Sequence, residues 1–286
     1  MSEAISEAAH RALAAHAAGE ISAEIALMRL VLALGDGEAV TACLERAGER
    51  RLLDLARAHA AGIAETAALV KAGLAGERSG SLAAIRAQFE RAASLSPEAA
   101  VALYSLGSSD ILDRATAEIV DRLRQWRLLG PAVRALDIGC GIGRLERALA
   151  PYLGAIVGID LSRAMIAEAR RRCAGLGNVE FFVGSGADLG DISGGRFGLV
   201  LAVDVFPYLV AADPAIAARH VADCARLLDP GGALVILNYA YRDDPARDRA
   251  EVAELAARHG FAVERSGTRD FALWDGTTFL LRRSYR

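Results

Sequence analysis

The stretch that decides the fold is ALDIGCGIGRLERALA, residues 135–150. An apolar run ends at Ile138, three glycines follow at alternate positions, and a helical pattern starts directly after them. Glycine has no Cβ atom, so it adopts backbone conformations that other residues avoid and lets another group come close to the chain. A simple turn does not need three glycines. The pattern therefore predicts a ligand site between a strand and a helix N-terminus, where backbone N–H groups point outward.

Short apolar runs alternate with helical patterns from residue 133 to the C-terminus. Continuous apolar strands that alternate with helices predict a mostly parallel sheet covered on both faces. The last two runs have no helix between them, so we expect them to pair antiparallel. The expected fold is α/β, with a doubly wound, mostly parallel, seven-stranded sheet whose last strand is antiparallel. Its strands are predicted at 133–138, 155–160, 179–184, 197–205, 232–239, 261–267 and 277–285.

The N-terminal third has a different pattern. Residues 1–95 are rich in Ala, Leu, Glu and Arg and contain no proline. Ser22, with Glu24 shortly after it and apolar residues at helical spacing, predicts a capped helix start. We expect an all-helical domain of four or five helices over residues 1–95, acting as a lid, a homodimerisation element or a docking module. The second domain is expected over residues 96–286, with 96–130 as lead-in helices and a candidate lid.

Composition narrows the classes of function. The 286-residue chain has a net charge of −3, which gives no electrostatic reason to expect a nucleic acid or an anionic membrane as partner. Its four cysteines form no C-x-x-C pair, so neither a metal site nor a disulfide framework is expected. The start of the sequence lacks the features of a secretory signal, and no apolar run is long enough to span a membrane. We therefore expect a cytoplasmic protein.

Each of the first two predicted strands has an acidic residue at or near its carboxyl end. Asp160 ends the second strand, where a carboxylate suits the two hydroxyls of a ribose. Asp137 lies two positions before the first glycine and is placed to help hold an ammonium group. Dinucleotide-binding folds have the spacing G-x-G-x-x-G, whereas this chain has G-x-G-x-G with Arg144 after it. A nicotinamide-dependent oxidoreductase thus remains an alternative that the glycine spacing disfavours.

With these residues, the sequence resembles the class I S-adenosylmethionine-dependent methyltransferases over about residues 97–286. Five segments in the family's order make up the resemblance: LDIGCGIGR (136–144), VGIDLS (157–162), FFVGSGADL (181–189), FGLVLAVDVFPYL (197–209) and RLLDPGGALVILNY (226–239). The resemblance implies S-adenosylmethionine as cofactor. Two positions depart from the family pattern: Ser185 replaces an acidic residue on the adenine side, and Gly198 replaces one before the fourth strand.

The resemblance also implies cofactor-binding residues. Three glycines and one carboxylate would surround the methionine part of the cofactor, namely Asp137, Gly139, Gly141 and Gly143. Asp160 would hold the ribose hydroxyls and Leu161 would lie against the adenine, with Ala187 and Asp188 at the adenine edge.

The acceptor side is expected at the ends of strands four, five and six. A sulfonium methyl group is already activated, so its transfer requires mainly an aligned nucleophile, and a base only where the acceptor loses a proton. Asp204 and Tyr208 are the candidate catalytic residues, as general base or orienting groups. Aromatic walls with a few polar groups are typical of small-molecule sites. The candidate substrate-binding residues are Tyr104, Phe206, Asn238, Tyr241, Arg242 and Trp274, each with a purely structural role as the alternative.

The sequence therefore predicts an S-adenosylmethionine-dependent methyltransferase acting on a small molecule. The segment DVFPY, residues 204–208, is similar to a motif of nucleic-acid amino-methyltransferases, but it has a single proline and no basic patch accompanies it. A non-catalytic S-adenosylmethionine-binding protein that works through its helical domain is the alternative.

Overall fold

The computed structural model describes residues 6–74, 80–193 and 195–285. The chain forms two compact units. The first comprises Met1–Glu77, Gln88–Glu118 and Phe271–Asp275, and the second Arg78–Ala87, Ile119–Asp270 and Gly276–Arg286. The domain boundary expected at residue 95 lies inside the first unit.

The first unit is helical. Its described helices, two of which continue into the second unit, are α1 (Glu7–Ala17), α2 (Ala23–Leu34), α3 (Gly37–Ala47), α4 (Arg50–Ala58), α5 (Ala60–Lys71), α6 (Leu82–Leu95), α7 (Pro97–Val101), the 3-10 turn η1 (Leu103–Ser105) and α8 (Ser109–Gln125). Ser22 caps α2 as predicted, because its Oγ accepts a hydrogen bond from the Ile25 N–H at 3.1 Å. The expectation of four or five helices before residue 95 was wrong, since six are described there. The long helical pattern after residue 37 breaks at Gly48, whose left-handed backbone ends α3, and again at His59.

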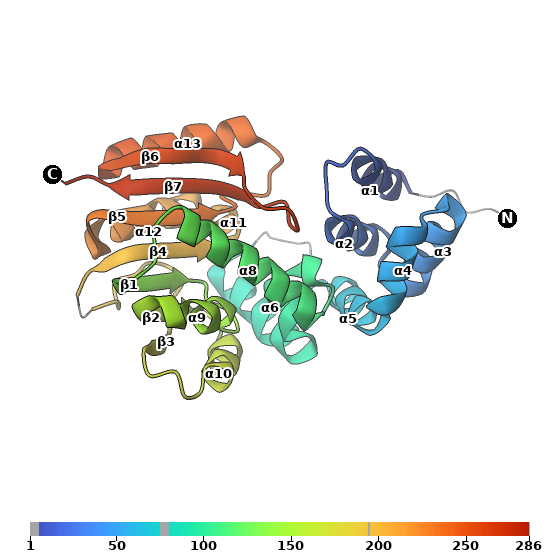
Figure 1. The fold of residues 1–286 in the computed structure, drawn as a ribbon, viewed down its shortest axis with the longest axis horizontal. Helices are drawn as coiled ribbons and strands as arrows, with labels where there is room; N and C mark the ends of the chain where they lie inside the picture. The colour runs from blue at the N-terminus through green and yellow to red at the C-terminus, as the bar shows by residue number, and fades with distance from the viewer. Residues whose placement is uncertain (1–5, 75–79, 194, 286) are drawn as a thin grey trace. The chain divides into compact units, whose positions relative to one another are not determined.

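The second unit is built on a seven-stranded sheet (Figure 1). Its strands are β1 (Gly130–Ile138), β2 (Leu153–Asp160), β3 (Val179–Val183), β4 (Phe197–Val203), β5 (Leu228–Leu237), β6 (Phe261–Arg269) and β7 (Thr277–Arg283). The strand order is β3-β2-β1-β4-β5-β7-β6, and β7 runs antiparallel to both of its neighbours. This confirms the predicted fold class. The strand order reverses between β1 and β4, and in such sheets ligands bind at the carboxyl ends of the strands at this point.

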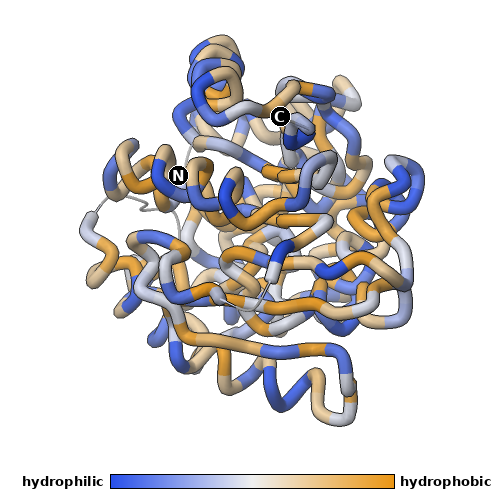
Figure 2. The backbone as a smooth tube through the Cα atoms, turned by 90° about the vertical axis from the view of Figure 1, so that its left-hand side faces the viewer, coloured by the Kyte–Doolittle hydropathy of each residue, from blue (hydrophilic) through white to orange (hydrophobic). Residues whose placement is uncertain are grey.

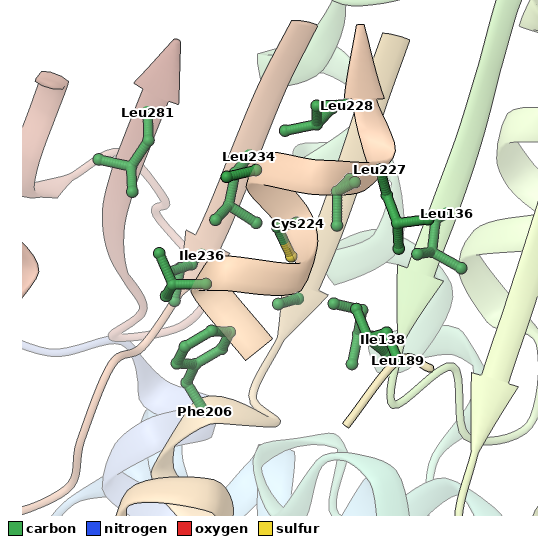
Figure 3. Packing of buried hydrophobic residues seen from close by; sticks show 14 of the residues in the cluster. Leu136, Ile138, Leu189, Phe206, Cys224, Leu227, Leu228, Leu234, Ile236 and Leu281 are labelled. Carbon is green, nitrogen blue, oxygen red and sulfur yellow. The ribbon is translucent and has the colours of Figure 1, made fainter. Parts of the chain in front are cut away.

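Helices cover both faces of the sheet. They are α9 (Arg144–Leu149), the 3-10 turn η2 (Ala150–Tyr152), α10 (Arg163–Arg172), α11 (Phe206–Ala212), α12 (Pro214–Leu227) and α13 (Pro245–His259). One face packs on α11, α12 and α13 through a large apolar cluster that contains Cys224 of α12, Ile236 and Phe206 (Figure 3). The other face packs on α10 through a smaller cluster around Ile166 and Phe181. Figure 2 shows the backbone coloured by hydropathy, with the hydrophobic stretches of the chain in orange and the hydrophilic ones in blue.

Within the part of the chain that the structure describes, no helix is both long and apolar enough to cross a bilayer.

Candidate functional site

The glycine turn connects β1 to α9. Gly139, Gly141 and Gly143 all have positive φ angles, of 72°, 54° and 76°. A Cβ atom on Gly139 would lie 2.7 Å from Val205, and one on Gly143 would lie 3.0 Å from Ala169. Two of the three glycines are therefore required by the packing of the chain on itself, and not only by the approach of a ligand.

Asp160 is held at the carboxyl end of β2 by backbone donors. Its Oδ2 accepts a hydrogen bond from the Gly141 N–H at 3.0 Å, and its Oδ1 accepts one from the Ser162 N–H at 2.8 Å. Ser162 in turn caps α10 by accepting from the Met165 N–H. The side chain is partly exposed, so hydroxyl donors of a ligand can reach its carboxylate. This geometry fits the role that the sequence predicts for Asp160.

A buried carboxyl pair lies beneath the turn. Asp137 on β1 is 2% exposed and Glu146 on α9 is 0% exposed. Burial raises the pKa of Asp137 to about 7, and the Arg144 guanidinium partly opposes this rise. Burial and the charge of Asp137 hold the pKa of Glu146 well above its usual range. Sequence reasoning missed Glu146, because a glutamate in the first turn of a helix is ordinarily a solvent-exposed partner of the helix dipole.

The loop after β3 contains the residues expected at an adenine edge. Asp188 is partly exposed and its Oδ1 accepts from the Gly190 N–H at 3.0 Å, while the Ala187 N–H donates to Ser185 Oγ at 3.1 Å. A Cβ atom on Gly186 would lie 3.6 Å from both Leu161 and Leu82. The loop thus lies beside Leu161, as expected, and also beside Leu82 at the start of α6. No local signal identifies Leu82, since its contact joins segments about a hundred residues apart in the sequence.

The carboxyl ends of β4 and β5 bring together three of the predicted acceptor-side residues. Asp204 and Asn238 have positive φ angles of 56° and 62°. Asp204 Oδ1 accepts from Asn238 Nδ2 at 2.7 Å and from the Tyr241 hydroxyl. Asn238 Oδ1 accepts from the backbone N–H of Thr277 on β7 at 2.8 Å, which fixes the amide. Because Val205 packs on Gly139, this cluster adjoins the glycine turn.

Phe206 does not lie where the sequence predicted. It is 0% exposed, and its ring lies 5.9 Å from that of Tyr239 in the sheet core (Figure 3). The helix α11 begins at Phe206, so its first residue turns back onto the sheet instead of extending beyond the strand end. Tyr208, in the same helix, is partly exposed.

Arg242 is engaged by carboxylates of α13. Its guanidinium lies 2.7 Å from Asp248 and 2.8 Å from Glu251, and above the ring of Tyr239. Its charge is thus already compensated within the second unit.

Tyr104 and Trp274 belong to the first unit. Both are buried, and their rings stack with centroids 5.6 Å apart. The segment around Trp274 is fastened to this unit by Glu118, whose carboxylate accepts from the Ala272 and Leu273 N–H groups, and by an ion pair between Arg29 and Asp275. The two rings are therefore core residues of the helical unit.

Titratable side chains are not grouped for metal binding: the described residues contain no set of three or more His, Cys, Asp and Glu suited to hold an ion. All four cysteines are buried, free thiols.

Comparison with known proteins finds similarity to methyltransferases over part of the chain. Residues 135–232 match the family described as "Methyltransferase domain". The chain is 36% identical over 100 residues to a ubiquinone biosynthesis O-methyltransferase of Methylococcus capsulatus, a match covering 35% of this chain and 40% of that protein. It is 30% identical over 131 residues to the 2-methyl-6-phytyl-1,4-hydroquinone methyltransferase of Synechocystis, covering 44% of this chain and 39% of that protein. The chain thus spans well under half the length of these curated relatives.

A solved structure with a similar fold is the phosphoethanolamine N-methyltransferase 1 of Haemonchus contortus in complex with phosphoethanolamine and S-adenosylhomocysteine. It matches with a TM-score of 0.54 and 14% identity, over 71% of this chain and 48% of that one.

Proposed function

We propose that this chain, which contains a class I methyltransferase domain, is an S-adenosylmethionine-dependent methyltransferase that acts on a small-molecule acceptor. The observation that supports this best is the glycine turn closed onto Asp160, with the Gly141 N–H bound to the Asp160 carboxylate at 3.0 Å. This contact would join the site for the amino-acid arm of the cofactor to the site for its ribose.

The residues present fit S-adenosylmethionine. Asp137 Oδ1 is buried and accepts from no donor among the described residues, which suits a carboxylate that faces an ammonium group. Asp160 would accept from the ribose hydroxyls, and Leu161 would contact the adenine beside Gly186. Asp188, which is partly exposed in the same loop, would accept a hydrogen bond from the adenine amine.

When bound, S-adenosylmethionine supplies a sulfonium methyl group that is already activated for in-line transfer. The contribution of the chain is then mainly to position the acceptor and to exclude water. Asp204 is the candidate base or orienting group for an acceptor that must lose a proton. Asn238 and Tyr241 keep its carboxylate in one orientation, since both donate to the same oxygen. Tyr208 remains a second candidate at this end of β4.

The first experiment is calorimetric binding of S-adenosylhomocysteine to the wild type, Asp160→Asn and Asp229→Asn. Asp229 is an exposed carboxylate at the amino end of β5, so its variant is the matched control. We expect the loss of the charged acceptor in Asp160→Asn to weaken binding by about 10- to 100-fold, with no change in the control. Absence of binding to wild type and control alike would refute the proposed function.

The second experiment addresses catalysis, with a panel of small hydroxyl, amine and thiol acceptors and S-adenosylmethionine bearing a labelled methyl group. We expect Asp204→Asn to lower kcat by about 100-fold or more without changing the affinity for S-adenosylhomocysteine, and Tyr241→Phe to lower it less. Tight cofactor binding without transfer to any acceptor would favour the non-catalytic alternative.

A further inference from the structure

Three neighbouring strands place Asp137, Gly158 and Phe181 in one row. Asp137 on β1 pairs with Gly158 on β2, and Gly158 pairs with Phe181 on β3. Side chains in such a row project from the same face of a parallel sheet, here the face covered by α9 and α10. The absent side chain of Gly158 leaves a space between the other two.

Glu146 of α9 fills that space. A Cβ atom on Gly158 would lie 2.5 Å from Glu146 Oε1, so the carboxyl group lies directly over the glycine. Glu146 is 0% exposed, and an ionised carboxylate buried without a partner is strongly unfavourable. Its presence here therefore requires a partner.

That partner is Asp137. Asp137 Oδ1 and both carboxyl oxygens of Glu146 accept from no donor within residues 6–74, 80–193 and 195–285. Asp137 is the register neighbour of Gly158, and the Glu146 carboxyl lies over Gly158, so the two carboxyl groups are adjacent. Two buried carboxyl groups this close do not both ionise, because their like charges repel each other. Near neutral pH the pair therefore keeps at least one proton.

We propose that Glu146 is a positioning residue that shares one proton with Asp137, so that the pair presents a single negative charge to the ammonium group of the cofactor's amino-acid arm. This inference rests on the proposed function. Glu146 donates in this arrangement and Asp137 bears the charge, because Asp137 is the residue that precedes the glycine turn. Glu146 itself does not need to touch the cofactor.

The other titratable and charged groups around the pair are few. They are Arg144 on α9, Asp160 at the end of β2, Cys140 in the turn and Cys173 after α10. Burial raises the pKa of Cys140 well above its usual range and that of Cys173 to about 11, so both thiols stay neutral. Arg144 and Asp160 act on the charge of Asp137 in opposite directions. Near neutral pH, the proton count of the site is thus set by the Asp137–Glu146 pair.

A bound ammonium group favours the ionised form of Asp137. Binding below the pKa of Asp137 therefore releases a proton, and affinity rises with pH until Asp137 is ionised without ligand. The probe is S-adenosylhomocysteine, titrated by calorimetry in buffers of different ionisation enthalpy at about pH 6 and about pH 8. The control ligand is 5′-methylthioadenosine, which lacks the amino-acid arm.

We compare the wild type with Glu146→Gln. The glutamine amide donates to Asp137 as the protonated Glu146 does, so the pKa of Asp137, which burial raises, is kept. We expect the wild type and Glu146→Gln to release a similar fraction of a proton, about half or more, at the lower pH. Any proton from the ligand's own ammonium group is common to both proteins and cancels in the difference. Neither protein should release a proton with 5′-methylthioadenosine.

A second measurement does not depend on ligand. At about pH 8, where Asp137 is ionised in both proteins, the infrared spectrum of the wild type should contain a protonated-carboxyl stretch that is lost in Glu146→Gln. A proton release or pH profile of Glu146→Gln that differs clearly from that of the wild type would overturn the role of Glu146 as a neutral donor while leaving the proposed function intact. Absence of the protonated-carboxyl band would overturn the shared proton, whether or not ligand binds. Failure of the wild type to bind S-adenosylhomocysteine would instead refute the proposed function and the role toward the cofactor with it.

Discussion

Glycines with a positive φ differ in what they contribute to stability, as Gly139 in the turn and Gly175 after α10 illustrate. In Gly139→Ala the new methyl group meets Val205 at 2.7 Å and the backbone keeps a positive φ. In Gly175→Ala the φ of 89° imposes the same kind of strain, but nothing lies within 4 Å. We expect Gly175→Ala to lower the free energy of unfolding by about 1 kcal/mol and Gly139→Ala by about 2–4 kcal/mol, since a steric clash adds to the strain.

Urea unfolding followed by circular dichroism measures both values. Equal losses in the two variants would mean that the β4 end moves away from the turn at little cost, and that the contact with Val205 does not fix the site.

Asp137 makes the stability of the protein depend on pH. Its pKa is raised from an ordinary value near 4 to about 7 by burial, so the folded state holds a proton that the unfolded state releases in this window. Wild-type stability is therefore highest below the unfolded pKa and falls as pH rises through 7. The variant Asp137→Asn has no carboxyl group at this position, so its stability lacks this dependence on pH. We expect its free energy of unfolding, relative to the wild type, to increase by a few kcal/mol between about pH 5 and about pH 8.

Chemical unfolding of both proteins across this range tests the sign. Exposed acidic side chains titrate mostly below about pH 5 and are common to both, so they do not affect the difference. A difference that is constant with pH, or that falls, would show that Asp137 ionises freely in the folded state.

Sequence reasoning identifies site residues whose role depends on local chain geometry. The glycines and Asp160 are found because a strand end and a turn place them. Glu146, Leu82 and Thr277 are not found, because each acts through a contact with a distant segment: Gly158, Gly186 and Asn238, respectively. Phe206 was misplaced for a related reason. The sequence shows an aromatic residue near a strand end, but only the start of α11 decides that its ring faces the core.

Among the elements, α13 offers a test of what Arg242 does. Asp248 of this helix is largely buried, and burial raises its pKa while Arg242 opposes that rise. Arg242→Ala leaves this carboxylate without its cation, so we expect a loss of about 2 kcal/mol in the free energy of unfolding. Arg247 in α13 contacts Glu251 but its side chain is 61% exposed, so Arg247→Ala should cost less than about 1 kcal/mol.

Thermal and urea unfolding measure the loss of stability in the two variants. The KM of each variant for an identified acceptor is measured as the control for a role in substrate binding. A substrate role for Arg242 would appear as a raised KM with unchanged stability, which is the opposite of the expected result.

Most elements were predictable because their periodicity is strong. The strands β1 to β5 have continuous apolar runs, and the helices α12 and α13 each begin at a proline, which favours the first helical position. The start of β1 at Gly130 was not expected, since Gly-Pro ordinarily ends a structure; here a register shift between Gly130 and Arg134 accommodates the proline. Element type thus follows from local pattern, whereas the element ends depend on tertiary contacts.

For the whole molecule, the sequence suggested a helical domain followed by an α/β domain, but the chain is not divided in this simple way. The helical unit includes residues 88–118 and the β6–β7 loop 271–275, and the α/β unit includes residues 78–87. Composition changes near residue 95 and residue 131, and neither change reports which unit a helix packs in. Both α6 and α8 contribute residues to each unit.

This sharing of helices predicts that the two units unfold together. The chain has two tryptophans, Trp126 in the second unit and Trp274 in the first. The single-tryptophan variants Trp126→Phe and Trp274→Phe therefore report on one unit each. Trp274 is 3% exposed and its Nε1 has no acceptor among the described residues, so phenylalanine there loses no hydrogen bond. The Trp126 ring lies under Arg265, so its replacement should cost about 0.5–1 kcal/mol.

When one unit unfolds, the residues of α6 and α8 that pack in it lose their contacts, and the rest of each helix is too short to persist alone. In urea, we expect the fluorescence transition of each variant to coincide with its own circular dichroism transition, as a two-state process requires. The urea midpoint of each variant by circular dichroism, compared with that of the wild type, shows how much stability the substitution itself removes. Separate transitions, with Trp274 changing at a urea concentration that leaves Trp126 unchanged, would show that the helical unit unfolds independently despite the shared helices.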